Sequence, residues 1–199
     1  DRALRGATAY KTLIIWPYAV APVVAGVLWF FLFNPTVGMV TFFLKGAGIP
    51  WNHTLNGPQA MTLVIIAAAW REISYNFLFF LAGLQAIPKE YYEAAELDGA
   101  SFFQKHRLIT WPLLSPTTFF LFTLGLIGAF QVFTQVYVLT PTGGVLQDTL
   151  TLAFYLYNKG FRDSDFSYAS AIAMVTFLVI LALTLVQRRL LEKRVNYEI

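Results

Sequence analysis

The stretch "EYYEAAELDGASFFQKHRLITWPLLSP", residues 90–116, is polar in a chain that is otherwise strongly apolar. It combines glutamates, an aspartate, a glycine, cations and a histidine, and it is followed closely by Pro112 and Pro116. Such a segment could be a catalytic loop, a metal site or a surface that contacts another molecule. The composition around it and the spacing within it separate these possibilities.

The composition of the chain is typical of a membrane protein. Hydrophobic residues make up 57%, aromatic residues 17% and charged residues 13%, and the mean hydropathy is +0.59. A soluble domain is about 45–50% apolar and about 25% charged. Cysteine is absent, which excludes disulfides, a thiolate nucleophile and a Cys-based zinc site. The chain begins with Asp1 and has no signal-peptide pattern, so we expect a fragment that lacks an N-terminal part.

Four apolar stretches are long enough to cross a bilayer, which takes about 20 residues. Arg71 and Glu72 are the only charges inside them, and Pro17 and Pro22 are expected to kink the first. Open strands cannot satisfy their backbone in lipid, so the sequence predicts an all-α, polytopic transmembrane helical bundle over residues 1–199. The predicted spans are 13–33, 60–84, 113–139 and 168–186.

The positive charges predict the orientation of the spans. Ten cations fall on one side, which we assign to the cytoplasm: Arg2, Arg5, Lys11, Lys89, Lys105, Arg107, Arg188, Arg189, Lys193 and Arg194. Three fall on the other side: Lys45, Lys159 and Arg162. The loop 85–112 is therefore expected in the cytoplasm. Segments 34–59 and 140–167 are expected outside, the second with a short helix near 150–157.

Within this loop the sequence predicts a helix–turn–helix. Pro88 suits the start of a helix, and Gly99 is placed to stop it. Ala100 to Arg107 would form a second short helix. A structured loop of this length indicates a docking surface, the alternative being an amphipathic element bound only to lipid headgroups.

Catalytic and metal chemistry is poorly supported. There is no phosphate-binding glycine loop of either common type. His53 and His106 fall on opposite sides of the predicted membrane and cannot share a metal. Glu93, Glu96 and Asp98 could coordinate a cation or form an acid–base pair, but they lie in an exposed loop flanked by cations. We therefore expect no metal site and no enzymatic activity.

The spacing of the polar stretch resembles the EAA loop of ABC importer permeases. Glu93-Ala94-Ala95, Gly99 and Ile109-x-x-Pro112 keep the family distances, with Trp111 where the pattern has leucine. The resemblance implies that this loop rests in a groove of a separate ATPase subunit and couples ATP use to the membrane spans. The implied coupling residues are Glu93, Ala94, Ala95, Asp98, Gly99, Ala100, Phe103, Ile109 and Pro112.

Other stretches are similar to the carbohydrate-uptake class of these MetI-like permeases. They are WPYAVAP (16–22), LFNP (32–35), ISYNFLFF (73–80), TGG (142–144) and YLYNKGF (155–161). A full subunit of this class has six spans, so the first two would be absent here. The sequence departs from the class at His106 and Arg107, where aromatic residues are frequent, and at Val145, where proline is usual.

The resemblance implies a multi-pass permease subunit in the bacterial cytoplasmic (inner) membrane. Its partners would be a homologous second permease, a dimer of ATP-binding subunits, an extracytoplasmic (periplasmic) solute-binding protein and membrane lipid, but no nucleic acid. The chain itself would bind no cofactor, because ATP and Mg belong to the ATPase. The expected cargo is sn-glycerol-3-phosphate.

Polar residues inside the spans are the candidates for the substrate path. An ionisable group at mid-membrane costs about 2.5–3.5 kcal/mol on insertion scales and usually faces a cavity or partner. Trp70, Arg71 and Tyr75 would line the path, and the guanidinium of Arg71 would suit a phosphate. Gln131 and Gln135, four residues apart, would add a polar strip. Alternatively, these residues anchor neighbouring spans to one another.

Three other functions remain as alternatives. A neutral sugar or oligosaccharide could replace the phosphorylated cargo. An intramembrane enzyme would need convergent His, Asp or Ser residues at one depth, and the sequence shows none. A voltage- or lipid-gated subunit would be favoured by a regular arginine ladder, which no span carries.

Overall fold

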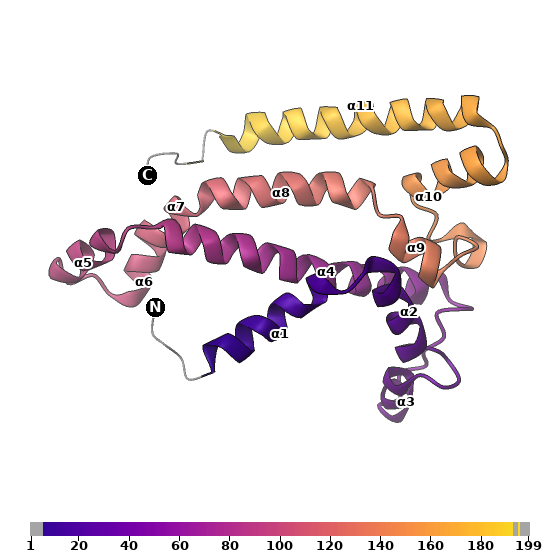
Figure 1. Ribbon diagram of the computed structural model, residues 1–199, viewed down its shortest axis with the longest axis horizontal. Helices are drawn as coiled ribbons and strands as arrows, with labels where there is room; N and C mark the ends of the chain where they lie inside the picture. Colours follow the sequence, from indigo (N-terminus) through magenta and orange to yellow (C-terminus); the bar gives the residue numbers. More distant parts are fainter. Residues whose placement is uncertain (1–5, 193–194, 196–199) are drawn as a thin grey trace. The chain divides into compact units, whose positions relative to one another are not determined.

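The computed structural model describes residues 6–192 and 195, and these residues form helices and loops without any strand (Figure 1). The all-α fold expected from the sequence is thus confirmed for the described part of the chain. Arg2, Arg5, Lys193 and Arg194, which contribute to the predicted orientation, lie outside the described residues.

The helices follow one another along the chain with short connections. They are α1 (Ala7–Ala19), α2 (Pro22–Leu32), α3 (Met39–Gly46), α4 (Gly57–Ala86), α5 (Lys89–Leu97), α6 (Phe102–Lys105), the π-helix η1 (His106–Thr110), α7 (Trp111–Leu113), α8 (Ser115–Phe130), α9 (Thr134–Leu139), the 3₁₀-helix η2 (Val145–Gln147), α10 (Leu152–Tyr157), the π-helix η3 (Asn158–Arg162) and α11 (Phe166–Leu191).

Two single helices of the described chain, α4 and α11, are long and apolar enough to cross a membrane. Two further candidates are bent pairs. The segment Thr8–Ala19 meets α2 at 100°, and Phe102–Leu113 meets α8 at 58°. The described residues therefore hold up to four candidate spans if each bent pair counts as one.

The first predicted span, 13–33, is broken into α1 and α2. Pro17 lies inside α1, whereas Pro22 occupies the first turn of α2. Ala21 is extended, with φ −56° and ψ 135°, because the ring of a proline disfavours the helical conformation of the residue before it. The break therefore follows from Pro22.

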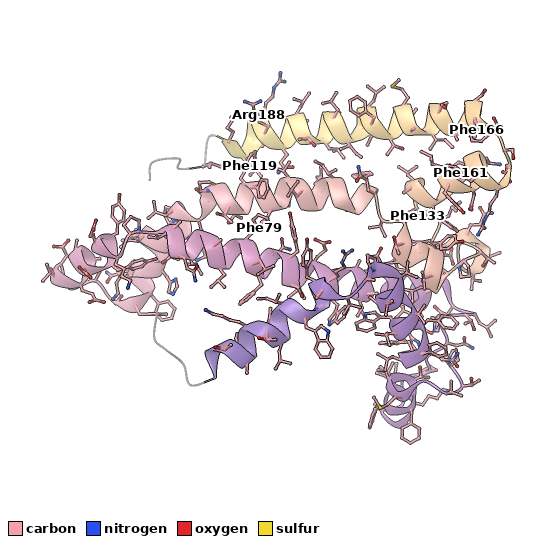
Figure 2. All side chains as sticks on the ribbon, in the orientation of Figure 1. Phe79, Phe119, Phe133, Phe161, Phe166 and Arg188 are labelled. Carbon is pink, nitrogen blue, oxygen red and sulfur yellow. The ribbon has the colours of Figure 1, made fainter. Side chains whose placement is uncertain are left out.

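The third predicted span, 113–139, also differs from a continuous helix. Residues 131–133 are not helical, and α9 begins at Thr134. A long-range contact holds the break: the hydroxyl of Thr151 donates to the carbonyl of Val132 at 2.8 Å. The ring of Phe133, which is labelled in Figure 2, lies 5.0 Å from that of Tyr157 and 5.4 Å from that of Tyr137, centre to centre.

The chain divides into two compact units, which are described separately. The first unit comprises the described residues of 1–74 and 128–178, and the second those of 75–127 and 179–199. The core lies in the first unit. Its buried apolar side chains are Phe33, Trp51, Leu63, Val64, Ala67, Val136, Leu139 and Phe154.

Close helix packing in the first unit depends on Gly26. This glycine of α2 faces α9, and a Cβ atom at its position would lie 2.9 Å from Cγ1 of Val138. Real Cβ atoms essentially never approach that closely, so the contact between α2 and α9 needs glycine here.

In the second unit, α8 packs against the end of α4 and the end of α11. The ring of Phe79, which is labelled in Figure 2, lies 5.5 Å from that of Phe120, centre to centre. On the other side, Nε2 of Gln187, a buried residue of α11, donates to Oγ1 of Thr123 at 2.7 Å. The segment that leads out of the 85–112 loop is thus fixed to both of its neighbours in this unit.

Candidate functional site

The 85–112 loop folds as the expected helical hairpin, with α5 and α6 as its arms (Figure 1). Pro88 is the N-cap of α5, and Gly99 follows its end in the left-handed conformation, with φ +75°. The amide of Gly99 donates to the carbonyl of Glu96 at 3.0 Å, and the amide of Ala100 donates to Ala95 at 2.8 Å. These bonds pair carbonyls that the helix end would otherwise leave free.

The second arm starts with a capping box that our sequence analysis missed. The amide of Gln104 donates to the side chain of Ser101 at 3.4 Å, and the amide of Ser101 donates to the side chain of Gln104 at 2.7 Å. The S-x-x-Q signature was the available signal. The second helix was expected over 100–107. The α-helix α6 covers only Phe102–Lys105, and the chain continues from His106 as the π-helix η1.

An ion pair joins the two arms. The ammonium of Lys105 donates to Oε1 of Glu96 at 2.7 Å. This hydrogen bond, with the charge of Lys105, lowers the pKa of the Glu96 carboxyl below its ordinary value. The Glu96 carboxylate therefore acts as a structural partner within the hairpin.

The predicted coupling residues fall into two groups. Glu93, Ala94, Asp98, Gly99 and Phe103 are exposed, whereas Ala95, Ala100, Ile109 and Pro112 are half-buried. The structure adds two large apolar side chains that the pattern did not single out: Leu97 is 91% exposed and Phe102 is 67% exposed. With Phe103, at 82%, they form what we call the apolar tip. Large apolar side chains left exposed outside the predicted spans are typical of a protein contact.

The environment of Arg71 in the first unit is aromatic. Its guanidinium carbon lies 5.9 Å from the centre of the Tyr18 ring, within range of a cation–π interaction. The neighbouring Trp70 meets Trp29 edge to face at 5.8 Å. Buried Nε of Arg71 has no hydrogen-bond partner among the described residues. Tyr18, in α1, and Trp29, in α2, were missed from the sequence, because both lie far from Arg71 along the chain.

The other predicted path residues are Tyr75, Gln131 and Gln135. Tyr75 belongs to the second unit, where its ring lies 4.7 Å from that of Phe79. Gln131 is exposed and Gln135 is half-buried in the first unit. The single polar strip inferred from their spacing is wrong, because a strip at i, i+4 needs a helix and the chain is not helical at 131–133.

On the expected outer side, His53 is buried, at 2% exposure, and its ring lies 5.8 Å from that of Phe30. Burial lowers the pKa of His53, and the nearby backbone of Phe33 opposes that shift less strongly. Within the described ranges, no three His, Asp or Glu side chains are grouped to hold a metal ion.

The chain matches a family model described as "Binding-protein-dependent transport system inner membrane component" over residues 4–197. Similar relatives named sn-glycerol-3-phosphate transport system permease protein UgpA come from Brucella abortus, Rhizobium meliloti and Yersinia enterocolitica. They are 49%, 48% and 46% identical to this chain, over 99%, 99% and 100% of its length and 67% of their own.

The fold is similar to that of a solved bacterial ABC transporter involved in the import of the acidic polysaccharide alginate. The TM-score is 0.84, and the match covers 97% of this chain and 68% of that chain at 23% identity. This similarity supports the helical architecture.

Proposed function

The chain belongs to the family of binding-protein-dependent transport system inner membrane components, and on this premise we propose that it forms the translocation path for sn-glycerol-3-phosphate. It is a membrane-spanning permease subunit of an ATP-driven (ABC) importer and not an enzyme. Such a permease works with a second permease, an ATPase and a substrate-binding protein. We propose that the second permease is homologous and that two ATPase subunits carry all the ATP and Mg.

The structure of the hairpin is the observation that supports a role in coupling to the ATPase. Its arms are fixed by the Gly99 turn, the capping box and the Lys105–Glu96 pair, while the apolar tip stays exposed. A rigid, exposed hairpin with an apolar tip suits a groove on a partner protein better than a solvated loop would. We propose that the ATPase provides that groove. Its closure on ATP would then displace the hairpin and the helices that follow.

Arg71 supports the choice of a phosphorylated cargo. A half-buried guanidinium with an unpaired N–H is costly unless an acceptor reaches it. Phosphate oxygens accept two parallel hydrogen bonds from arginine. The rings of Tyr18, Trp29 and Trp70 would exclude water around the glycerol part. The same rings would suit a sugar face, so a neutral sugar remains the competing cargo.

Transport by the complete importer in proteoliposomes tests this proposal. Arg71→Ala should lower uptake of sn-glycerol-3-phosphate by about a hundredfold, the equivalent of two lost charge-assisted hydrogen bonds. Arg71→Lys should lose less, because the charge stays and only the planar fork is lost. Glu72→Gln, a change at the exposed neighbouring position, is the matched control and should transport normally.

Two results would contradict the proposed cargo. One is wild-type uptake of a maltose-like sugar with no uptake of sn-glycerol-3-phosphate. The other is unchanged uptake of sn-glycerol-3-phosphate by Arg71→Ala.

A further inference from the structure

A hydrogen bond between two side chains joins α5 of the hairpin to the segment that leads into the membrane helices. The family pattern does not pair these two residues. The hydroxyls of Tyr92 and Thr110 lie 3.0 Å apart and share a hydrogen bond across 18 residues of chain. Tyr92 is in the middle of α5, and Thr110 is the last residue of η1, directly before α7. Thr110 is 5% exposed and Tyr92 is half-buried, so the bond is partly sheltered from water.

The π-helix that carries Thr110 has a local cause. Pro112 has no N–H to donate to the carbonyl of Leu108, and its ring crowds that carbonyl. The turn before Pro112 widens into the π-helix, a feature frequently found at functional sites. The carbonyl of Thr110 accepts from the amide of Leu114 at 3.0 Å, so Thr110 is joined to the helices that follow.

The other links within the hairpin are weaker candidates for transmitting force. The Lys105–Glu96 pair joins α5 only to α6, and Glu96 is 64% exposed. Exposed pairs of this kind are screened by salt and contribute little. The Gly99 turn joins α5 only to the loop that enters α6, and no heavy atom lies within 4 Å of a Cβ at its position to link it to the membrane helices. By contrast, the Tyr92–Thr110 bond joins two neutral groups. It connects α5 directly to the end of η1, without the turn or α6 between them.

We propose that Tyr92 and Thr110 are positioning residues that make α5 move together with α7 and α8 when the ATPase displaces the hairpin. This proposal rests on the proposed function of the hairpin. Without the bond, α5 would still dock through its exposed residues, but its movement would reach α8 only by the longer route through the turn, α6 and η1. ATP would then be hydrolysed with less transport.

The experiment measures solute transported per ATP hydrolysed by the complete importer in proteoliposomes. Tyr92→Phe and Thr110→Val should each lower this ratio by about fivefold, the factor expected for one neutral hydrogen bond. The rate of ATP hydrolysis should stay near the wild-type value. The double variant should be no worse than either single one, because both remove the same bond.

Two controls make the test specific. Thr110→Ser keeps the hydroxyl and should keep the ratio near wild type. Tyr91→Phe removes the hydroxyl of the neighbouring, exposed tyrosine of α5 and should change nothing.

The proposal would be overturned if Tyr91→Phe lowered the ratio as much as Tyr92→Phe, or if the effects of Tyr92→Phe and Thr110→Val multiplied in the double variant. Equal losses of transport and ATP hydrolysis would also overturn it, since they indicate a role in assembly. Failure of the wild type to take up sn-glycerol-3-phosphate would instead contradict the proposed cargo, and the ratio would then be read on the sugar that is transported.

Discussion

In the first unit, eight buried apolar side chains form one cluster around Leu63 and Phe154, whereas no side chain of α5 or α6 in the second unit is buried. The first unit keeps its shape by burial and close packing. The hairpin keeps its shape through caps, a glycine turn, an ion pair and one partly sheltered hydroxyl pair. The apolar groups of the hairpin stay exposed, so directional bonds replace packing there.

Two glycines allow the comparison to be tested, beginning with the larger effect. Gly26→Leu should destabilise the first unit by about 1–3 kcal/mol or more, because the new side chain would collide with Val138. The thermal unfolding midpoint of the purified complex measures this. Gly125→Ala in α8 is the control, since nothing lies within 4 Å of a Cβ there. An unchanged midpoint for Gly26→Leu would show that the core of the first unit is not closely packed.

The hairpin glycine should behave differently. Gly99→Ala meets no neighbouring atom, so its cost is the left-handed backbone alone, about 1–2 kcal/mol, and is confined to the hairpin. The unfolding midpoint should hardly move, while co-purification of the ATPase should weaken. Gly99→Asn should recover most of the binding, because asparagine tolerates this conformation. Normal ATPase binding by Gly99→Ala would contradict a role for the turn.

Mild acid should destabilise the first unit before it breaks the Lys105–Glu96 pair of the hairpin. This is the smallest effect that we expect. The pKa of His53 is lowered by burial, so the unfolded chain binds more protons than the folded one as the pH falls. Stability of the first unit should therefore decrease as the pH drops below about 6.5, the ordinary value for histidine. It should level off once the pH is below the folded pKa.

The hairpin pair should persist through this range, because the pKa of Glu96 is lowered from an ordinary value of about 4.3. Unfolding midpoints at pH 7.5 and pH 5 test the difference. The wild type should lose more stability than His53→Gln between the two. If the wild type and His53→Gln lost equal stability between pH 7.5 and pH 5, the acid sensitivity of the first unit would not come from His53.

The features that could be predicted from the sequence are those set by neighbouring residues. The hairpin follows from Pro88 and Gly99, which act within one or two turns of themselves. The break before α9 depends on Thr151 reaching Val132, and the surroundings of Arg71 depend on Tyr18. Contacts between distant segments leave no local pattern, so the predicted third span was too continuous and the polar strip at Gln131 and Gln135 was wrong.

Site-specific cross-linking tests the central claim, that the apolar tip docks on the ATPase. The chain has no cysteine, so Phe103→Cys introduces a single thiol at an 82% exposed position. Phe161→Cys, at a 69% exposed position in η3, is the matched control (Figure 2). The account predicts that a short bifunctional reagent in the assembled importer joins position 103, and not position 161, to the ATPase. A cross-link from position 161 to the ATPase, or none from position 103, would contradict it.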